Sequence, residues 1–414
     1  MAFLAIGSAV VSSFALEGET DLEDINKYLD RDDIDALKEW VRERKQHVKV
    51  KKPPGSLVLS GEVRTELQST NEKLNKVKQL GSGGAVPGTS ARTWDIEVRL
   101  QLDYKTERTW AQARLRFDND AGTRSGTTNR LKLDRAFLGG KIINASDYSI
   151  KLQAGRWDLS LYFDSQIQFL SLMDGILFLY DHALDWAGDF YLHGGPFVVD
   201  EKIDQFAYVG EVGLLNIGKT GLYSKVAFID WDTKNTSKKD VESELRNREY
   251  RFRNWQVIVG YKWTPALLGK GVDCFVAYLI NTAAKRLPVT ANKKANMAWY
   301  TGFRIGSVKK QWDWSFQFVY EWLQAQSVPG FDVLGVGRGN AAKVGLYGKG
   351  TTLFNSPSQA RGNTNYRGLS AILQYMLTDN ITVYQRWRQS TRLSSAIGVP
   401  FSYKQYEIEL IYGF

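Results

Sequence analysis

The chain has 414 residues, a slightly negative mean hydropathy and no run of about 20 apolar residues, which excludes a transmembrane helix. A single cysteine, Cys274, excludes an internal disulfide framework. The formal net charge is +9, but no Lys/Arg-rich helix or base-stacking motif organises it, which argues against a nucleic-acid-binding protein.

The first 15 residues are typical of a secretory signal peptide. Residues 2–15 form an apolar run, and the small residues Ser13 and Ala15 precede a possible cleavage site before Leu16. No basic residue precedes the run, which a chain clipped at its start would explain; the alternative to a signal peptide is a disordered apolar N-terminus.

Residues 16–55 differ in composition and predict a charged helical segment followed by a linker. Thr20 and Glu23 form a capping-box pattern, and apolar residues follow at helical spacing. The run Pro53-Pro54-Gly55 ends the helical pattern. The segment is too polar to cross lipid, so we expect it in the periplasm if the remaining chain spans an outer membrane. It is either a solvated spacer or a helix pair that oligomerises or contacts the cell wall.

From Ser56 onward, apolar and polar residues alternate with a period of two, which predicts β-strands. In residues 312–324, for example, Trp, Phe and Tyr alternate with Asp, Ser, Gln and Glu. Most of these segments are near the roughly 9–11 residues that a tilted membrane strand needs. The predicted strands, about 16 in all, are residues 57–68, 94–105, 111–118, 132–143, 149–159, 174–184, 188–199, 205–217, 221–231, 254–264, 272–282, 296–306, 312–324, 367–378, 381–391 and 401–414.

The connections between these strands are alternately long and short, with few exceptions. Bacterial membrane barrels have short periplasmic turns and long external loops, whereas a soluble sandwich has no reason to obey this rule. Backbone groups in lipid must pair, so the sheet must close. Residues 56–414 therefore predict an all-β fold, a transmembrane antiparallel β-barrel of about 16 strands.

The last strand ends on alternating apolar residues that include Tyr412 and Phe414. This ending resembles the C-terminal signal of outer-membrane barrels, which implies that the barrel-assembly machinery is a partner. Through strand number, loop alternation and the final Phe, residues 56–414 resemble the Gram-negative porin superfamily. The resemblance implies an outer-membrane channel, surrounded by lipid and often trimeric, through which small hydrophilic solutes or ions diffuse passively.

In porins the third external loop commonly folds into the lumen and narrows it. Here the corresponding loop is Ser160–Met173, which contains Asp164 and has Asp158 and Asp174 at its edges. Its apolar residues need cover, which an inward fold would provide; the alternative is that residues 161–173 extend the adjoining strands. The Pro-Glu-Phe-Gly-Gly-Asp type of motif found in the loops of enteric porins is absent.

Inward-facing arginines on the first three strands and on the fifteenth should meet when the barrel closes. We expect them to form an electropositive wall opposite the acidic loop, although each could equally pair with a nearby Glu. Residues 56–414 carry 45 basic and 34 acidic residues, which is consistent with a weak anion preference. The candidate wall residues are Arg64, Arg99, Arg114, Arg116, Arg386 and Arg388.

Catalysis is not expected, because the predicted barrel contains only two histidines, His182 and His193, and no nucleophile motif. No metal-ligand spacing or nucleotide-binding motif is present, so we expect neither a metal nor a cofactor. A structural or surface-contact barrel remains an alternative to a channel. In that case the external loops 232–253 and 325–366 would bind partners.

Overall fold

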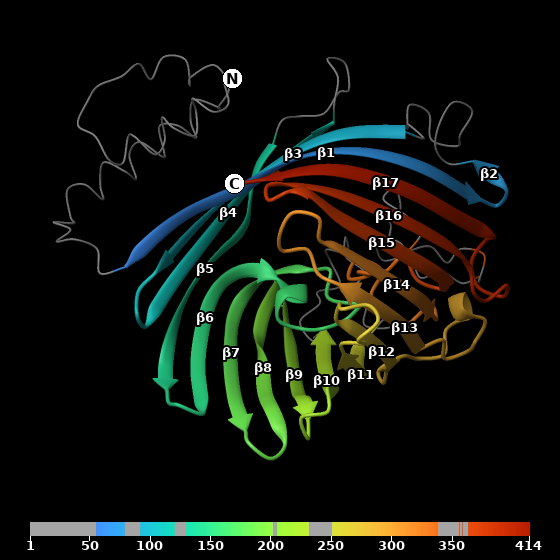
Figure 1. Cartoon of the computed structure of the whole chain (residues 1–414). Helices are drawn as coiled ribbons and strands as arrows, with labels where there is room; N and C mark the ends of the chain where they lie inside the picture. The colour runs from blue at the N-terminus through green and yellow to red at the C-terminus, as the bar shows by residue number, and fades with distance from the viewer. Residues whose placement is uncertain are drawn as a thin grey trace. The chain divides into compact units, whose positions relative to one another are not determined.

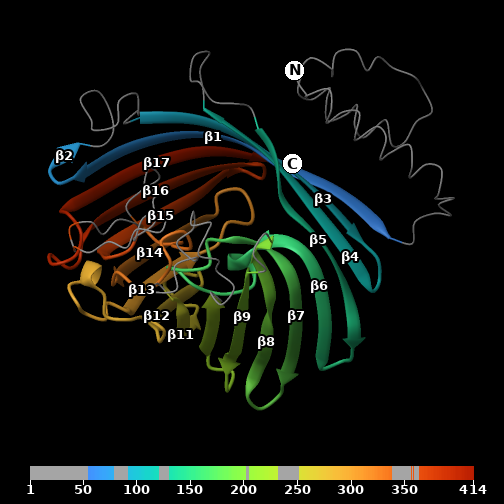
Figure 2. The same cartoon turned by 180° about the vertical axis from the view of Figure 1, so that it is seen from behind.

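The computed structural model describes residues 55–78, 92–120, 130–201, 205–231, 251–337, 356, 358 and 363–414. Within them, sixteen strands form one antiparallel sheet that closes into a barrel, and the short strand β2 (Val77–Lys78) pairs with the end of β1 (Figures 1 and 2). The sixteen are β1 (Ser56–Leu74), β3 (Arg92–Lys105), β4 (Thr109–Asp120), β5 (Arg130–Asn144), β6 (Tyr148–Asp158), β7 (Leu172–Leu184), β8 (Gly188–Asp200), β9 (Gln205–Ile217), β10 (Leu222–Trp231), β11 (Arg253–Trp263), β12 (Val272–Asn281), β13 (Met297–Gly306), β14 (Trp314–Leu323), β15 (Tyr366–Thr378), β16 (Ile381–Arg392) and β17 (Phe401–Gly413). The predicted fold class is confirmed.

The barrel closes between its first and last strands. β1 and β17 pair over 13 residue positions, from Glu62 opposite Gly413 to Leu74 opposite Phe401. At the chain end, the N–H of Phe414 donates to the Gly61 carbonyl (3.0 Å), and the N–H of Gly61 donates to the Phe414 carbonyl (2.9 Å). Because β1 also pairs with β3, the described sheet has no open edge at this seam.

The two faces of the wall differ as the alternation predicts. In β11, Trp255 and Val257 are more than 40% exposed, whereas Asn254 and Gln256, which alternate with them, are fully buried. Successive side chains of a strand point to opposite faces, so the exposed apolar set covers the outside and the polar set faces inward. An apolar exterior around a closed sheet suits a hydrocarbon surrounding.

Long and short connections alternate around the barrel, as predicted. The short connections are 106–108, 145–147, 185–187, 218–221, 264–271, 307–313 and 379–380. The others are 75–91, 121–129, 159–171, 201–204, 232–252, 282–296, 324–365 and 393–400; 201–204 is short, and 393–400 is only as long as 264–271. No helix among the described residues is long and apolar enough to cross a membrane.

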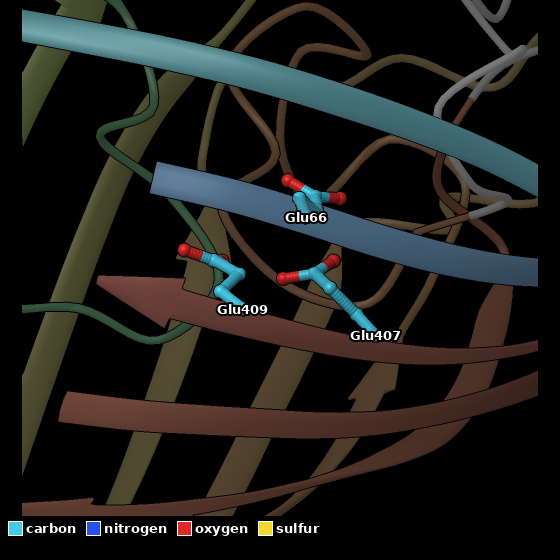
Figure 3. Close-up of side chains that lie close together, drawn as sticks. All are labelled: Glu66, Glu407 and Glu409. Atoms are coloured by element: carbon cyan, nitrogen blue, oxygen red, sulfur yellow. The ribbon is translucent and has the colours of Figure 1, made fainter. Parts of the chain in front are cut away.

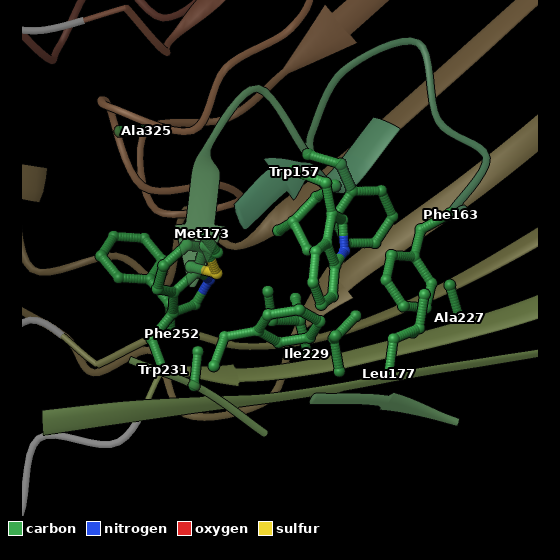
Figure 4. Packing of buried hydrophobic residues seen from close by; sticks show 14 of the residues in the cluster. Trp157, Phe163, Met173, Leu177, Ala227, Ile229, Trp231, Phe252 and Ala325 are labelled. Carbon is green, nitrogen blue, oxygen red and sulfur yellow. The ribbon is translucent and has the colours of Figure 1, made fainter. Parts of the chain in front are cut away.

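Apolar side chains fill part of the barrel interior near the long connections. One buried cluster joins Trp157, Phe197 and Ile229 of the strands to Phe163 and Phe169 of the β6–β7 connection (Figure 4). A second cluster joins strand residues to the described part of the β14–β15 connection. The interior is therefore divided: apolar packing covers one part of the wall, and charged side chains line another.

The less regular predicted strands are present in the structure, and β1 is longer than predicted. The segment 132–143 lies within β5, where two register shifts interrupt the pairing and disturb the alternation. The predicted signal peptide, residues 1–15, and all of the predicted helical segment and linker, residues 16–55, except Gly55 lie outside the described residues.

Candidate functional site

The β6–β7 loop, residues 159–171, lies inside the ring of strands (Figures 1 and 2). It starts with a short 3-10 turn, Leu159–Leu161, and continues without regular structure to Ser171. Its middle alternates in burial. Phe163, Ser165 and Ile167 are buried, whereas Tyr162, Asp164 and Gln166 are partly exposed. One side of the loop therefore packs against the wall, and its polar side stays accessible.

Hydrogen bonds fasten this loop to the inner faces of β9, β10 and β11. The backbone N–H of Asp164 donates to Glu211 Oε2 (2.9 Å), and Lys225 Nζ donates to the Asp164 carboxylate (2.7 Å). Ser165 Oγ donates to Gln256 Oε1 (2.8 Å). The partner strands lie two to four strands beyond β7 in the sheet order, so the loop runs along the inner wall instead of extending its own strands.

A buried carboxylate in the β14–β15 loop, residues 324–365, holds the other end of the β6–β7 loop. Asp332 accepts hydrogen bonds from the N–H of Phe169 (3.1 Å), the N–H of Ser171 (3.0 Å) and the Ser171 hydroxyl (2.6 Å). Burial raises the pKa of Asp332 to about 6, although these hydrogen bonds oppose the shift. Phe169 has a φ of 74°, a left-handed conformation that is costly for a bulky residue. The β6–β7 loop thus packs against the described part of the β14–β15 loop.

The six predicted wall arginines lie on β1, β3, β4 and β16, which are close neighbours around the seam. Each forms at least one ion pair, so positive and negative charges are interleaved on this wall. The pairs are Arg64 with Glu62 (2.7 Å) and Glu409 (3.0 Å), Arg99 with Glu62 (2.8 Å) and Glu97, Arg114 with Asp134 (2.8 Å) and Asp158 (3.3 Å), Arg116 with Glu97 (2.7 Å), and Arg386 (2.6 Å) and Arg388 (3.8 Å) with Glu407.

The three predicted loop acids do not cluster. Asp164 pairs with Lys225, and Asp158 contacts two arginines, one of them on the predicted wall. Asp174 lies in β7 on the outer face, which it shares with the exposed Ile176, and both its oxygens bind Arg156 at 2.7 Å. Asp174 therefore does not belong to the inner rim of the loop, contrary to its predicted position.

Several residues that organise the interior were not predicted. Lys225, Glu211 and Asp332 anchor the β6–β7 loop, and Arg135 binds Asp158 at 3.1 Å. Lys225 and Glu211 occupy inward positions of strands in which apolar and polar residues alternate. The period-two pattern could therefore have selected them as lumen residues. Nothing in the sequence connects Asp332 to the loop that it holds.

The predicted C-terminal signal residues lie on the outer face at the seam. Tyr412 and Phe414 are about half exposed, at 49% and 52%. The Phe414 ring covers Gly61 so closely that a Cβ at Gly61 would lie 2.6 Å from the ring. An aromatic ring over a strand glycine is a known means of fixing strand register.

The two barrel histidines do not form a common site. His193 faces inward, and its Nε2 lies 3.1 Å from Asp181 Oδ1. His182, by contrast, shares the outer face of β7 with Phe178, and its Nδ1 lies 2.9 Å from the Tyr180 hydroxyl. They therefore offer no shared ligand set or catalytic pair.

A closed barrel of sixteen antiparallel strands with an internal third loop is a general-porin-like fold. No protein-family model matches the chain, and neither does any curated protein. Similar solved structures include a quintuple mutant of the Rhodopseudomonas blastica porin, with a TM-score of 0.45, 10% identity and coverage of 87% of this chain and 100% of that one. A triple mutant of the same porin has a TM-score of 0.44 at the same identity and coverage. A third structure, entitled "Asymmetric conductivity of engineered proteins", has a TM-score of 0.45, again with 10% identity and the same coverage.

Proposed function

We propose that the protein is an outer-membrane channel through which small hydrophilic solutes diffuse passively. The observation that supports this proposal is the inner wall near the seam, where partly exposed arginines and carboxylates from β1, β3 and β4 line the interior. Sixteen strands enclose more space than side chains alone fill, and a charged interior favours water. The β6–β7 loop would narrow this passage from the opposite side.

The interleaved charges limit the selectivity that we expect. An arginine that contacts a carboxylate has much of its field cancelled at a distance, and physiological salt screens charges beyond about 8 Å. The six arginines are matched by six carboxylates, so an arginine would act only on ions that pass close to it. We therefore propose a weak anion preference rather than a strong one.

Single-channel recording in planar bilayers under a KCl gradient tests both parts of the proposal. Replacing Arg99, Arg114 and Arg116 together by Ser should move the reversal potential toward cation selectivity. The matched control replaces three lysines of the predicted external loop 232–253, Lys234, Lys238 and Lys239, and should move the reversal potential much less. A larger effect in the control, or a cation-selective wild type, would refute the selectivity. Absence of conductance from a folded barrel would refute the channel and favour the surface-contact alternative.

We also propose that Tyr412 and Phe414 form the signal that the barrel-assembly machinery reads. Both side chains are presented outward at the end of the strand that closes the sheet, where another protein could contact them. A homotrimer in the outer membrane is proposed from the resemblance to porins, and cross-linking of intact membranes would test it.

A further inference from the structure

Three glutamates meet on the inner side of the seam. Glu66 belongs to β1, and Glu407 and Glu409 belong to β17. One carboxylate oxygen of each lies within 4.8 Å of an oxygen of each of the others (Figure 3). Like charges this close repel one another strongly in a partly buried wall, so the arrangement needs compensation.

Each of the three carboxylates is held by a polar side chain through one of its two oxygens. The hydrogen bonds run from Gln68 Nε2 to Glu66 Oε1 (2.9 Å), from Arg386 Nη2 to Glu407 Oε2 (2.6 Å) and from Arg64 Nη1 to Glu409 Oε2 (3.0 Å). Such bonds fix the orientation of a carboxylate, as the outer-shell partners of metal ligands do. No hydrogen bond from the described residues reaches the second oxygen of each glutamate.

The neighbouring arginines do not satisfy the whole cluster. Glu407 is only 1% exposed, yet its Oε1 is buried and has no hydrogen-bond partner in the described part of the chain. Figure 3 shows its carboxylate directed toward the space between Glu66 and Glu409. Glu66 forms no ion pair with any described residue, and Arg64 divides its contacts between Glu409 and Glu62. A buried acceptor and an unpaired charge therefore point into the same space.

We propose that Glu66, Glu407 and Glu409 bind a divalent cation of the size of Ca²⁺, which bridges the first and last strands of the barrel. Ca²⁺ binds oxygen ligands at about 2.3–2.6 Å, so two of its ligands can lie nearly 5 Å apart. Mg²⁺ requires about 2.0–2.1 Å and a stricter geometry, which fits oxygens up to 4.8 Å apart less well. Water would complete the coordination. The inference goes beyond the proposed channel, because it does not depend on conduction.

Calcium binding to the folded, full-length protein in detergent tests the proposal. After treatment with a chelator, CaCl₂ is titrated in a calorimeter, and the temperature at which the barrel loses its heat-modifiable form is measured with and without the ion. We expect a dissociation constant on the order of 10⁻⁴–10⁻³ M, as in sites with few protein ligands, and a rise in that temperature. Glu66→Gln should weaken binding at least tenfold. The control Asp103→Asn removes another inward carboxylate, on β3, and should bind as the wild type does.

A proton shared between two of the glutamates would satisfy the cluster without a metal. In that case the wild type would bind no Ca²⁺ up to 10-fold above the expected range, and Glu66→Gln would be at least as heat-resistant as the wild type without the ion. Either result overturns the proposal, as does calcium binding that survives in Glu66→Gln. Glu409→Gln is measured in parallel. If Glu66→Gln does not fold, the calcium affinity and heat resistance of Glu409→Gln are compared with those of the wild type, with the same expected results.

Discussion

The buried Asp332 carboxylate should control how firmly the β6–β7 loop is held inside the barrel. Asp332→Ala removes the acceptor of three hydrogen bonds from Phe169 and Ser171. It also releases Phe169, whose left-handed backbone must be held in place by its surroundings. We expect the segment around Phe169 and Ser171 to open more often, without loss of the barrel.

The size of the increase in loop opening follows from the hydrogen bonds that are lost and the apolar contacts that remain. A buried donor left without an acceptor costs about 1–3 kcal/mol, so two backbone N–H groups cost roughly 2–6 kcal/mol. Burial raises the pKa of Asp332 to about 6, which shows that the ionised carboxylate is itself disfavoured, so the lower figure applies. About 2 kcal/mol corresponds to a roughly 30-fold larger opening constant. Phe163, Ile167 and Phe169 are each at most 1% exposed and contribute roughly 1.5–3 kcal/mol apiece, so the loop stays docked on average.

Amide hydrogen exchange of a peptide covering residues 162–171 measures this opening in detergent micelles. The matched control is Asp313→Ala. Asp313 also accepts two backbone N–H groups, from Lys309 (3.2 Å) and Lys310 (3.1 Å), but in an exposed turn. Exchange in residues 162–171 should rise about 30-fold in Asp332→Ala and stay unchanged in the control. Equal exchange in both variants would refute the role of Asp332, and faster exchange throughout the strands would show that the residue stabilises the whole barrel instead.

Three further predictions concern pH, assembly and the N-terminal segment. Because the folded pKa of Asp332, about 6, lies above its ordinary value of about 3.9, the folded state holds this proton more tightly. The wild type should therefore gain stability over Asp332→Asn as pH falls from 7 to 4, by up to about 1.4 kcal/mol per pH unit in denaturant titrations, and a gain on raising the pH would contradict this. Phe414→Asp places a charge over Gly61 on the lipid side and should reduce the heat-modifiable, assembled fraction, whereas normal assembly would argue against the C-terminal signal. Deleting residues 17–52 should leave barrel folding and conductance intact if they form a spacer, and loss of the folded barrel would make them part of its structure.

The alternation of residues was sufficient to predict the barrel, because each strand has one face against lipid and one against a polar interior. It was least regular where pairing is irregular. In β5, register shifts at Asp134, opposite Arg114 and Leu115 of β4, and between Lys141 and Ile143 change which residues face inward. In β7, Asp174 stands on the outer face because Arg156 on the neighbouring strand neutralises it. Neither effect can be found without knowing which residues lie opposite one another.

The inward fold of the β6–β7 loop followed from its apolar residues, which need cover. The residues that hold the loop could not be predicted, since Asp332 is separated from Ser171 by 161 residues. The same holds for the seam, where Arg64 is separated from Glu409 by 345 residues. Such pairs depend on the register across the seam and on loop packing, and neither leaves a pattern in the sequence. The glutamate cluster was missed for the same reason, because Glu66 and Glu409 become neighbours only when the barrel closes.

The pairing of Gly61 with Phe414 has a consequence for biosynthesis. β1 gains its second neighbour only when β17 is present, and without β17 the 13 positions of β1 that pair with it have no partner on that side. A product truncated before β17 would expose the hydrogen-bonding edges of β1 and β16, and unsatisfied backbone groups cost several kcal/mol each in hydrocarbon. In hydrocarbon, a chain that lacks β17 would therefore be less stable than the closed barrel.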